Sequence, residues 1–206
     1  DNLMTKLKPD YLAILKRAIK IKKAKEAGLS FLRIGADAGK AANAVAAVKM
    51  VKDAGLKCFY SAMKSYVLPA DALSEEAVAL ERAGLDLFTI MDSAGTMLPN
   101  EVSDYIIAIK KAVKIPVGFH GHNNLGLSVG NAVAALDAGA EYLDTGLMGM
   151  ARSAGNCPTE LLVGALARKG IDSGCDFYKM CSFIDNNLAP AMKTYNYTSA
   201  VAPKDL

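Results

Sequence analysis

The chain contains two histidines, and they stand two residues apart in Phe119-His120-Gly121-His122-Asn123. Side chains two positions apart on a β-strand point to the same face, so both imidazoles are expected to project together while Phe119 faces the opposite way. Two neighbouring imidazoles are suited to binding one divalent metal ion. The pair therefore predicts a metal site with His120 and His122 as ligands; the alternative is a pair of hydrogen-bonded core histidines.

Other polar residues follow short apolar runs in the same manner. Asp92 and Ser93 end the run 86–93, and Asn156 lies in the glycine-rich segment 146–160. Asp92 suits either a catalytic role or a structural role as an acceptor at a turn. The glycine-rich segment either brings the Asn156 amide toward the metal or cradles a phosphate at the start of the next helix.

The elements that would position these residues are marked by a recurring helix stop. Amphipathic stretches end at Gly28, Gly55, Gly84 and Gly139, with spacings of about 27, 29 and 55 residues. Glycine takes the left-handed conformation that closes a helix, and the first two spacings fit one strand-helix unit. The third spans two units, with the glycine stop replaced by Lys114-Ile115-Pro116. The runs that follow predict five strands, at 31–37, 57–65, 86–93, 116–123 and 141–149.

Five strands that alternate with helices predict an α/β fold with a parallel sheet. An open doubly wound sheet and a closed barrel both fit, but the first strand has no G-x-G-x-x-G turn. Polar residues at nearly every carboxy-terminal strand end favour a (β/α)₈ TIM barrel, which needs eight units. With an opening helix at 9–27 and a helical stretch at 176–195, we expect a single domain over 1–206, truncated at both ends.

One charged pair is expected inside this sheet. Arg33 and Asp37 are both odd-numbered in the first run and share a face. An arginine enclosed by a barrel needs a carboxylate, and Asp144 in the last run is the expected partner. An internal ion pair is favoured over a substrate-binding role for Arg33.

Composition narrows the class of protein. The 206 residues are 52% hydrophobic and 22% charged, with a formal net charge of +3, which is typical of a globular domain with one core. The basic cluster at 16–25 has no aromatic residues interleaved with its lysines and arginine, which argues against nucleic-acid binding. No apolar run approaches about 18 residues, which argues against membrane insertion. The first residues lack the apolar region of a signal peptide, which argues against secretion. Four cysteines without C-x-x-C spacing favour reduced thiols and a cytoplasmic location.

Three motifs, in this order, carry a family resemblance: IMDSAGTMLPNEV from residue 90, GFHGHNNLGLSVGNAVAAL from residue 118 and LMGMARSAGNCPTELL from residue 147. Residues 30 to 170 resemble the HMGL-like (pyruvate carboxyltransferase-type) family, which contains 4-hydroxy-2-oxovalerate aldolase, hydroxymethylglutaryl-CoA lyase and isopropylmalate synthase. The resemblance is greatest to the hydroxy-oxovalerate aldolase branch. The family's first strand, with its aspartate ligand and enolate-stabilising arginine, has no counterpart here.

The resemblance implies that His120, His122 and Asn156 bind a divalent metal, with Mn²⁺ or Mg²⁺ favoured and Zn²⁺ as an alternative. It implies that Ser93 and Asn156 bind substrate, and that Ser93, with Asp92 as a further candidate, takes part in catalysis. The expected function is a lyase or aldolase acting on a C–C bond next to a 2-oxo acid, through a pyruvate enolate. A Claisen-type acyl-CoA condensing acyltransferase and a catalytically inert barrel fragment are the alternatives.

The expected partners are a small 2-oxo acid substrate and, at the open edges of the sheet, another copy of the chain or a partner dehydrogenase. Because the first strand of the family is missing, the isolated chain is expected to be a poor catalyst.

Overall fold

A computed structural model of the protein describes residues 9–195, with side chains from residue 18 onward. Residues 1–8 and 196–206 of the expected domain lie outside the described residues. The elements, in chain order, are α1 (Pro9–Glu26), β1 (Phe31–Asp37), α2 (Ala42–Asp53), β2 (Lys57–Met63), η2 (Ser65–Val67), α3 (Ala70–Arg82), β3 (Leu87–Asp92), α4 (Pro99–Ala112), β4 (Val117–Gly121), α5 (Ser128–Asp137), β5 (Tyr142–Asp144), η3 (Leu147–Gly149), α6 (Thr159–Arg168), α7 (Phe177–Phe183), η4 (Ile184–Leu188) and α8 (Ala189–Thr194).

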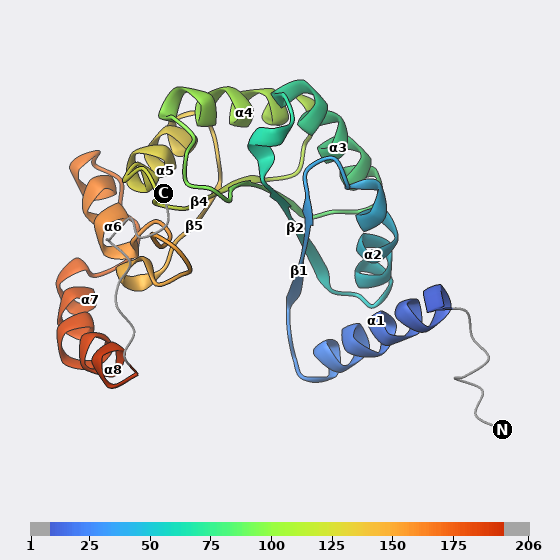
Figure 1. Ribbon diagram of the computed structural model, residues 1–206, viewed down its shortest axis with the longest axis horizontal. Helices are drawn as coiled ribbons and strands as arrows, with labels where there is room; N and C mark the ends of the chain where they lie inside the picture. The colour runs from blue at the N-terminus through green and yellow to red at the C-terminus, as the bar shows by residue number, and fades with distance from the viewer. Residues whose placement is uncertain (1–8, 196–206) are drawn as a thin grey trace.

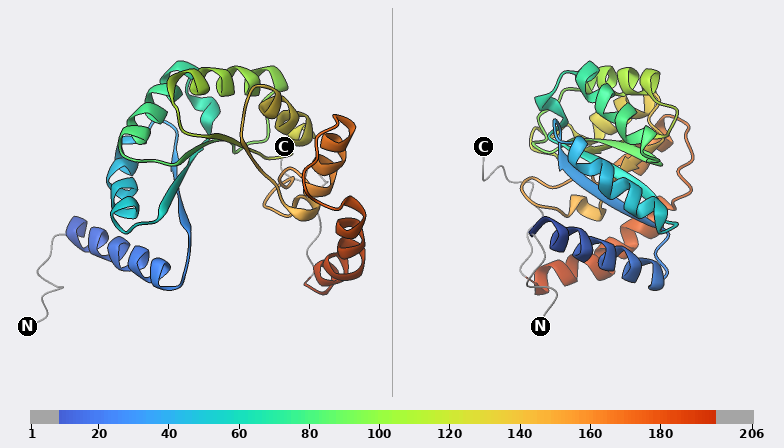
Figure 2. Two further views of the ribbon diagram at one scale, coloured as in Figure 1. Left: turned by 180° about the vertical axis from the view of Figure 1, so that it is seen from behind. Right: turned by 90° about the vertical axis from the view of Figure 1, so that its right-hand side faces the viewer.

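The five strands form one parallel sheet in the order β1-β2-β3-β4-β5, as predicted. The five strands form the inner, concave layer of an arch, and α2, α3, α4 and α5 cover its outer, convex side (Figure 1). Helix α1 lies at one end of the arch and α7 and α8 at the other (Figure 2). Because each strand pairs with the next in sequence, all five carboxy-terminal ends lie on one rim, where the predicted site residues should meet.

The predicted helix stops are confirmed. Gly28, Gly55, Gly84 and Gly139 have φ angles of 82°, 74°, 98° and 104°, in the left-handed region that closes a helix. Each lies between a helix and the strand that follows it. The glycines at the helix ends therefore predicted the repeating strand-helix unit correctly.

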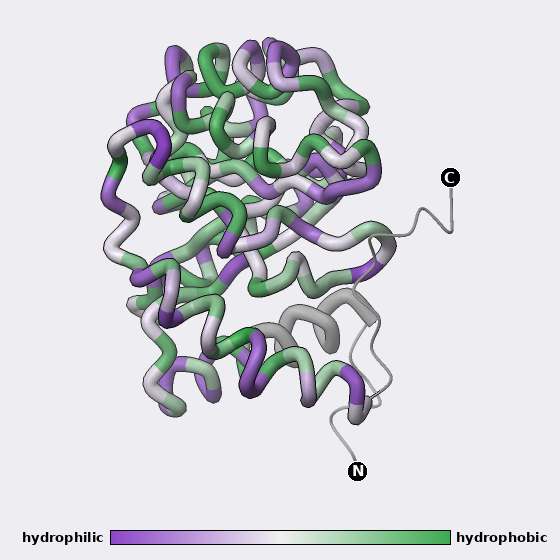
Figure 3. Tube along the Cα trace, turned by 90° about the vertical axis from the view of Figure 1, so that its left-hand side faces the viewer, coloured by the Kyte–Doolittle hydropathy of each residue, from purple (hydrophilic) through white to green (hydrophobic). Residues whose placement is uncertain are grey.

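The core lies between the strands and the outer helices. Tyr60, Phe88 and Phe119 are buried there together with apolar residues of α2, α3 and α4. Along the helices, hydrophilic and hydrophobic residues alternate, as Figure 3 shows, because only one face of each helix meets the sheet. Phe119 has 1% of its surface exposed, so its position on the helix side, opposite the histidines, is confirmed.

Three strands end two or more residues earlier than predicted, and each ends for a local reason. β2 ends at Met63 because Lys64 adopts a left-handed conformation, with φ 55°. β4 ends at Gly121, and His122 pairs instead with Asn156 in an isolated antiparallel bridge. β5 ends at Asp144, and the chain then turns into η3, in which Met148 has φ 53°.

The helical stretch expected at 176–195 is interrupted. It consists of α7, one turn of π-helix at Ile184–Leu188, and α8, near whose start Pro190 has no N–H to donate to the preceding turn. Within residues 9–195, no helix combines the length and the apolar character needed to cross a membrane.

Candidate metal and substrate site

The two histidines lie side by side at the rim. His120 is in β4, His122 follows one residue after its end, and their ring centroids are 5.2 Å apart at an interplanar angle of 63°. The side chain of His120 is 15% exposed, and His122 as a residue is 5% exposed. The rings therefore share one side of the sheet, as the two-residue spacing predicted.

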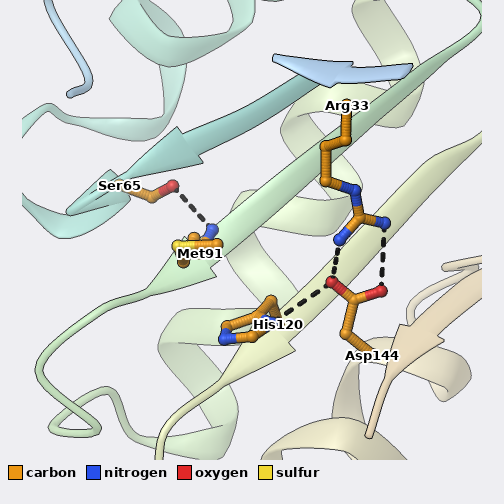
Figure 4. Close-up of polar contacts among 5 residues, drawn as sticks. All are labelled: Arg33, Ser65, Met91, His120 and Asp144. Atoms are coloured by element: carbon orange, nitrogen blue, oxygen red, sulfur yellow. Dashed lines mark hydrogen bonds and ion pairs between the residues drawn. The ribbon is translucent and has the colours of Figure 1, made fainter. Parts of the chain in front are cut away.

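A carboxylate from the neighbouring strand holds His120. His120 and Asp144 are direct partners in the β4-β5 register, and Nδ1 of His120 lies 3.2 Å from Oδ2 of Asp144. Arg33 reaches across the concave side from β1 and donates from both guanidinium nitrogens to the same carboxylate, Nη2 to Oδ1 at 3.1 Å (Figure 4). The predicted pair of Arg33 and Asp144 is confirmed, and it orients a histidine as well.

The electrostatics of Asp144 fit this role. Burial raises the pKa of the Asp144 carboxyl, but the hydrogen bonds from His120 and Arg33 outweigh burial and hold the pKa below its usual value. The carboxylate is therefore ionised at neutral pH and can accept a proton bound to Nδ1 of His120, which leaves Nε2 of that ring free as a ligand. Carboxylate partners of this kind fix the orientation of metal-binding histidines.

Replacing Asp144 with asparagine should weaken metal binding at His120. Asp144→Asn is expected to lower Mn²⁺ affinity by about 10- to 100-fold, because His120 loses its charged acceptor. Titration of the protein with Mn²⁺, followed calorimetrically, measures this. The matched control is Asp137→Asn, which removes a surface ion pair with Lys169 (Nζ to Oδ2, 3.0 Å) and should leave the affinity unchanged. Equal affinities for all three proteins would contradict the orienting role.

Asn156 is brought to the histidines by the glycine-rich segment. The backbone N–H of Asn123 donates to the Gly155 carbonyl (2.9 Å), and that of Cys157 donates to the Gly121 carbonyl (3.1 Å). These bonds flank a non-hydrogen-bonded antiparallel pair of His122 and Asn156, the geometry in which opposite side chains lie closest. This pairing places Asn156 opposite His122, and its role as a metal ligand stays a prediction.

The residues present fit a metal ion. Nδ1 of His122 and Oδ1 of Asn156 are both buried and have no hydrogen-bond partner within the described residues. A buried polar atom without a partner is costly, and a bound cation would satisfy an imidazole lone pair and an amide oxygen at once. Between residues 18 and 195, no three His, Cys, Asp or Glu side chains gather at one point, so the third protein ligand here would be the amide.

The protonation of His122 also suits a ligand. Burial lowers the pKa of His122 to about 4, and the charges of Arg152 and His120 act in the same direction. The imidazole is therefore neutral at neutral pH, the form in which histidine binds metals.

Ser93 lies next to the histidines along the rim, between two cations. Its Oγ accepts a hydrogen bond from the backbone N–H of Lys64 (2.9 Å), and its carbonyl accepts one from Nη2 of Arg152 (2.9 Å). Arg152 thus ties the glycine-rich segment to the end of β3. Ser93 is only partly buried, so it can contact a ligand bound at the histidines.

Asp92 faces the other way. It lies on the side of β3 shared by Phe88 and Ile90, toward the helices, and is 0% exposed. Its Oδ1 accepts from the backbone N–H of Thr96 (3.2 Å) and its Oδ2 from that of Met97 (3.0 Å). Burial raises the pKa of Asp92 although these backbone donors oppose it. The contacts are those of a structural acceptor at a turn; a catalytic role for Asp92 stays an untested prediction.

Asp92→Ala should therefore act on stability. Removing both acceptors leaves buried backbone donors without partners, at an expected cost of about 2 to 4 kcal/mol in the free energy of unfolding. Urea denaturation measures it. Asp71→Ala, at an exposed position in the first turn of α3, is the control and should change little. A stable Asp92→Ala protein that has lost only turnover would indicate the catalytic role instead.

Sequence reasoning missed two contacts of the site. The bond between His120 and Asp144 depends on the β4-β5 register, for which a single sequence carries no signal. The second is Arg152, whose charge acts on His122 and whose guanidinium donates to the Ser93 carbonyl. At the start of α5, the side-chain oxygen of Asn123 accepts from the backbone N–H of Ser128 (3.2 Å), and the amide of Asn124 donates to Oγ of Ser153 (2.9 Å).

Comparisons with known proteins give matches over most of the chain. The model of the HMGL-like family matches residues 20–186. A 4-hydroxy-2-oxovalerate aldolase from Geobacillus genomosp. 3 is 37% identical over 172 residues, 84% of this chain and 51% of that protein. One from Carboxydothermus hydrogenoformans is 43% identical over 146 residues, 71% of this chain and 44% of that protein. The chain spans about half the length of the curated relatives it matches.

Solved structures share the fold. The N-terminal domain of a putative aldolase from Bacteroides vulgatus superposes with a TM-score of 0.72 at 29% identity, over 82% of this chain and 56% of that one. The carboxyl transferase domain of Rhizobium etli pyruvate carboxylase superposes with a TM-score of 0.75 at 19% identity, over 94% of this chain and 33% of that one, which is a likeness of fold alone. The arch is thus part of a (β/α)₈ TIM barrel, as predicted.

Proposed function

We propose, since the chain belongs to the HMGL-like family, that its rim binds a divalent metal ion and takes part in the aldol cleavage or formation of a C–C bond next to a 2-oxo acid. The relatives named 4-hydroxy-2-oxovalerate aldolase support the reaction class. The observation that carries the proposal is that two buried atoms of paired residues beside His120, Nδ1 of His122 and Oδ1 of Asn156, have no hydrogen-bond partner in the described part of the chain.

The residues of the rim would have different roles according to their positions. His120, His122 and Asn156 would hold the ion, and Asp144 with Arg33 keeps His120 in its orientation. Ser93, on the neighbouring strand end, is placed to donate a hydrogen bond to a carboxylate or carbonyl oxygen of the 2-oxo acid.

A bound divalent ion would supply Lewis-acid stabilisation of the negative charge that develops on the ketone oxygen as the C–C bond breaks. A mixed nitrogen and oxygen ligand set suits Mn²⁺ or Mg²⁺, with Zn²⁺ as the alternative.

The test uses the methyl protons of pyruvate. Pyruvate is incubated in D₂O with the protein and Mg²⁺, and the loss of its methyl signal is followed by proton NMR. We expect exchange that depends on both protein and metal and is abolished in His122→Ala. Release of pyruvate from 4-hydroxy-2-oxovalerate is measured in parallel, as is release of free thiol from acetyl-CoA with pyruvate.

Each outcome decides between the candidate functions. Exchange with pyruvate release supports the aldolase. Thiol release without cleavage would replace it with the condensing acyltransferase. Absence of exchange, cleavage and thiol release in metal-loaded protein would leave an inert barrel fragment and overturn the proposal. A cytoplasmic location, a small 2-oxo acid substrate and association with another copy or with a dehydrogenase are parts of the same proposal.

A further inference from the structure

The rim carries a cluster of cations beyond the proposed metal site. Nζ of Lys64 lies 3.2 Å from Oδ2 of Asp37, and Nζ of Lys40 lies 3.9 Å from the same oxygen. Lys64 also contacts Ser93 through its backbone. We propose that Lys64 binds a second anionic group at the far end of the substrate, so that the preferred 2-oxo acid is a dianion. This inference rests on the proposed function.

The order of the strands sets the direction in which a substrate would extend. The histidines lie at the end of β4, Ser93 at the end of β3 and Lys64 at the end of β2, and these three strands are neighbours. Adjacent strands are about 4.8 Å apart, so β2 and β4 are separated by about 10 Å. A ligand with its 2-oxo acid group at the histidines and Ser93 therefore meets the Lys64 ammonium with a group a few carbons beyond the ketone.

The charge balance of the rim favours an anion there. Lys40 and Lys64 share the carboxylate of Asp37, and the nearby Glu76 carboxylate accepts from the backbone N–H of Ala41 (3.0 Å). Arg152, on the other side of Ser93, donates to a carbonyl and forms no ion pair in the part of the chain that the structure describes. Ser93 thus lies between the backbone of Lys64 and the guanidinium of Arg152. Ammonium and guanidinium groups form their strongest hydrogen bonds with carboxylates and phosphates.

Stability does not account for the lysine at this position. Lys64 has φ 55°, a conformation that is unfavourable for residues other than glycine, asparagine and aspartate. The side chain of Lys64 is 52% exposed, so its ion pair with Asp37 adds little to folding. Strained residues of this kind cluster at ligand sites. Because Ser93 holds the backbone of Lys64, the lysine has a fixed place next to the predicted substrate residue.

The experiment compares two ligands that differ only at the far end. The Mn²⁺-loaded protein is titrated calorimetrically with 2-oxoglutarate and with 2-oxovalerate, which carries a methyl group in place of the second carboxylate. We expect 2-oxoglutarate to bind about tenfold more tightly. In Lys64→Ala this ratio should fall toward one, and Lys64→Arg should restore most of it. Lys57→Ala, at the opposite end of the same strand, is the matched control and should keep the wild-type ratio.

The outcomes separate this inference from the proposed function. Metal-dependent binding of both ligands with equal affinity would overturn the role of Lys64 and leave the proposed function standing. An unchanged preference in Lys64→Ala would do the same. If neither ligand binds in a metal-dependent way, the proposed function falls and this inference falls with it.

Discussion

His122→Ala should leave the protein without a retained divalent ion. The wild-type protein, incubated with Mn²⁺ and desalted, is expected to hold about one ion per chain, and the variant less than about a tenth of that. The reason is that removing the ring deletes one ligand and leaves the Asn156 oxygen without the cation that satisfies it. Even outer-sphere changes lower metal affinity about 10- to 100-fold, so loss of a direct ligand should cost at least as much.

A matched control separates metal loss from unfolding. Asn131→Ala also removes a buried polar side chain whose oxygen has no partner among the described residues, but in α5, where its amide donates to the Met97 carbonyl (2.8 Å). It should retain Mn²⁺ at the wild-type ratio, as measured by elemental analysis of the desalted protein. Cooperative urea unfolding is recorded for both variants. A folded His122→Ala protein that holds one ion per chain would show that the ion binds elsewhere.

Gly155→Ala should displace Asn156 and weaken the site from a distance. Gly155 has φ 85°, and a Cβ atom there would lie 2.4 Å from the backbone oxygen of Gly149. A shift of Gly155 would disturb the bond from the N–H of Asn123 to its carbonyl, and a shift of Gly149 would disturb the bond from the N–H of Asn156 to its carbonyl. We expect a loss of about 1 to 3 kcal/mol in the free energy of unfolding and a fall in Mn²⁺ affinity of more than about tenfold.

The control for this change is a glycine with the same conformation and free space. Gly126 has φ 71°, and no atom lies within 4 Å of the place that a Cβ atom would take. Gly126→Ala therefore carries the same conformational strain without a steric clash. It should lose about 1 kcal/mol of stability and keep its metal affinity. Denaturation and calorimetric titration measure both quantities. Equal metal affinities in the two variants would mean that the segment does not present Asn156 to the ion.

The repeating parts of the fold were predictable because they depend on local rules. Gly28, Gly55, Gly84 and Gly139 marked the helix ends since glycine alone adopts the left-handed conformation freely. Four of the five strands followed from the apolar runs after these stops, and the fourth strand in sequence followed from the run after Pro116. The common side of His120 and His122 followed from the two-residue period of a strand, and it survives although β4 ends between them.

The finer geometry depends on contacts between distant segments, which local rules do not reach. Strand β2 stops at Met63 because Ser93, 29 residues beyond Lys64, holds that residue's backbone in a left-handed turn. The antiparallel bridge of His122 with Asn156 arises from pairing of two loops. The pairing of Arg33 with Asp144 was predictable from charge and face, whereas the bond of Asp144 to His120 required the register.

The central claim is that two imidazoles bind one cation at the rim, and pulsed electron paramagnetic resonance of the Mn²⁺-loaded protein tests it most directly. The chain has two histidines, both at this site, so every histidine nitrogen coupling must come from them. We predict modulation from two imidazole ¹⁴N nuclei, which changes to the ¹⁵N pattern when the histidines are labelled with ¹⁵N. A spectrum of hydrated Mn²⁺ without nitrogen coupling, at saturating protein, would contradict the account.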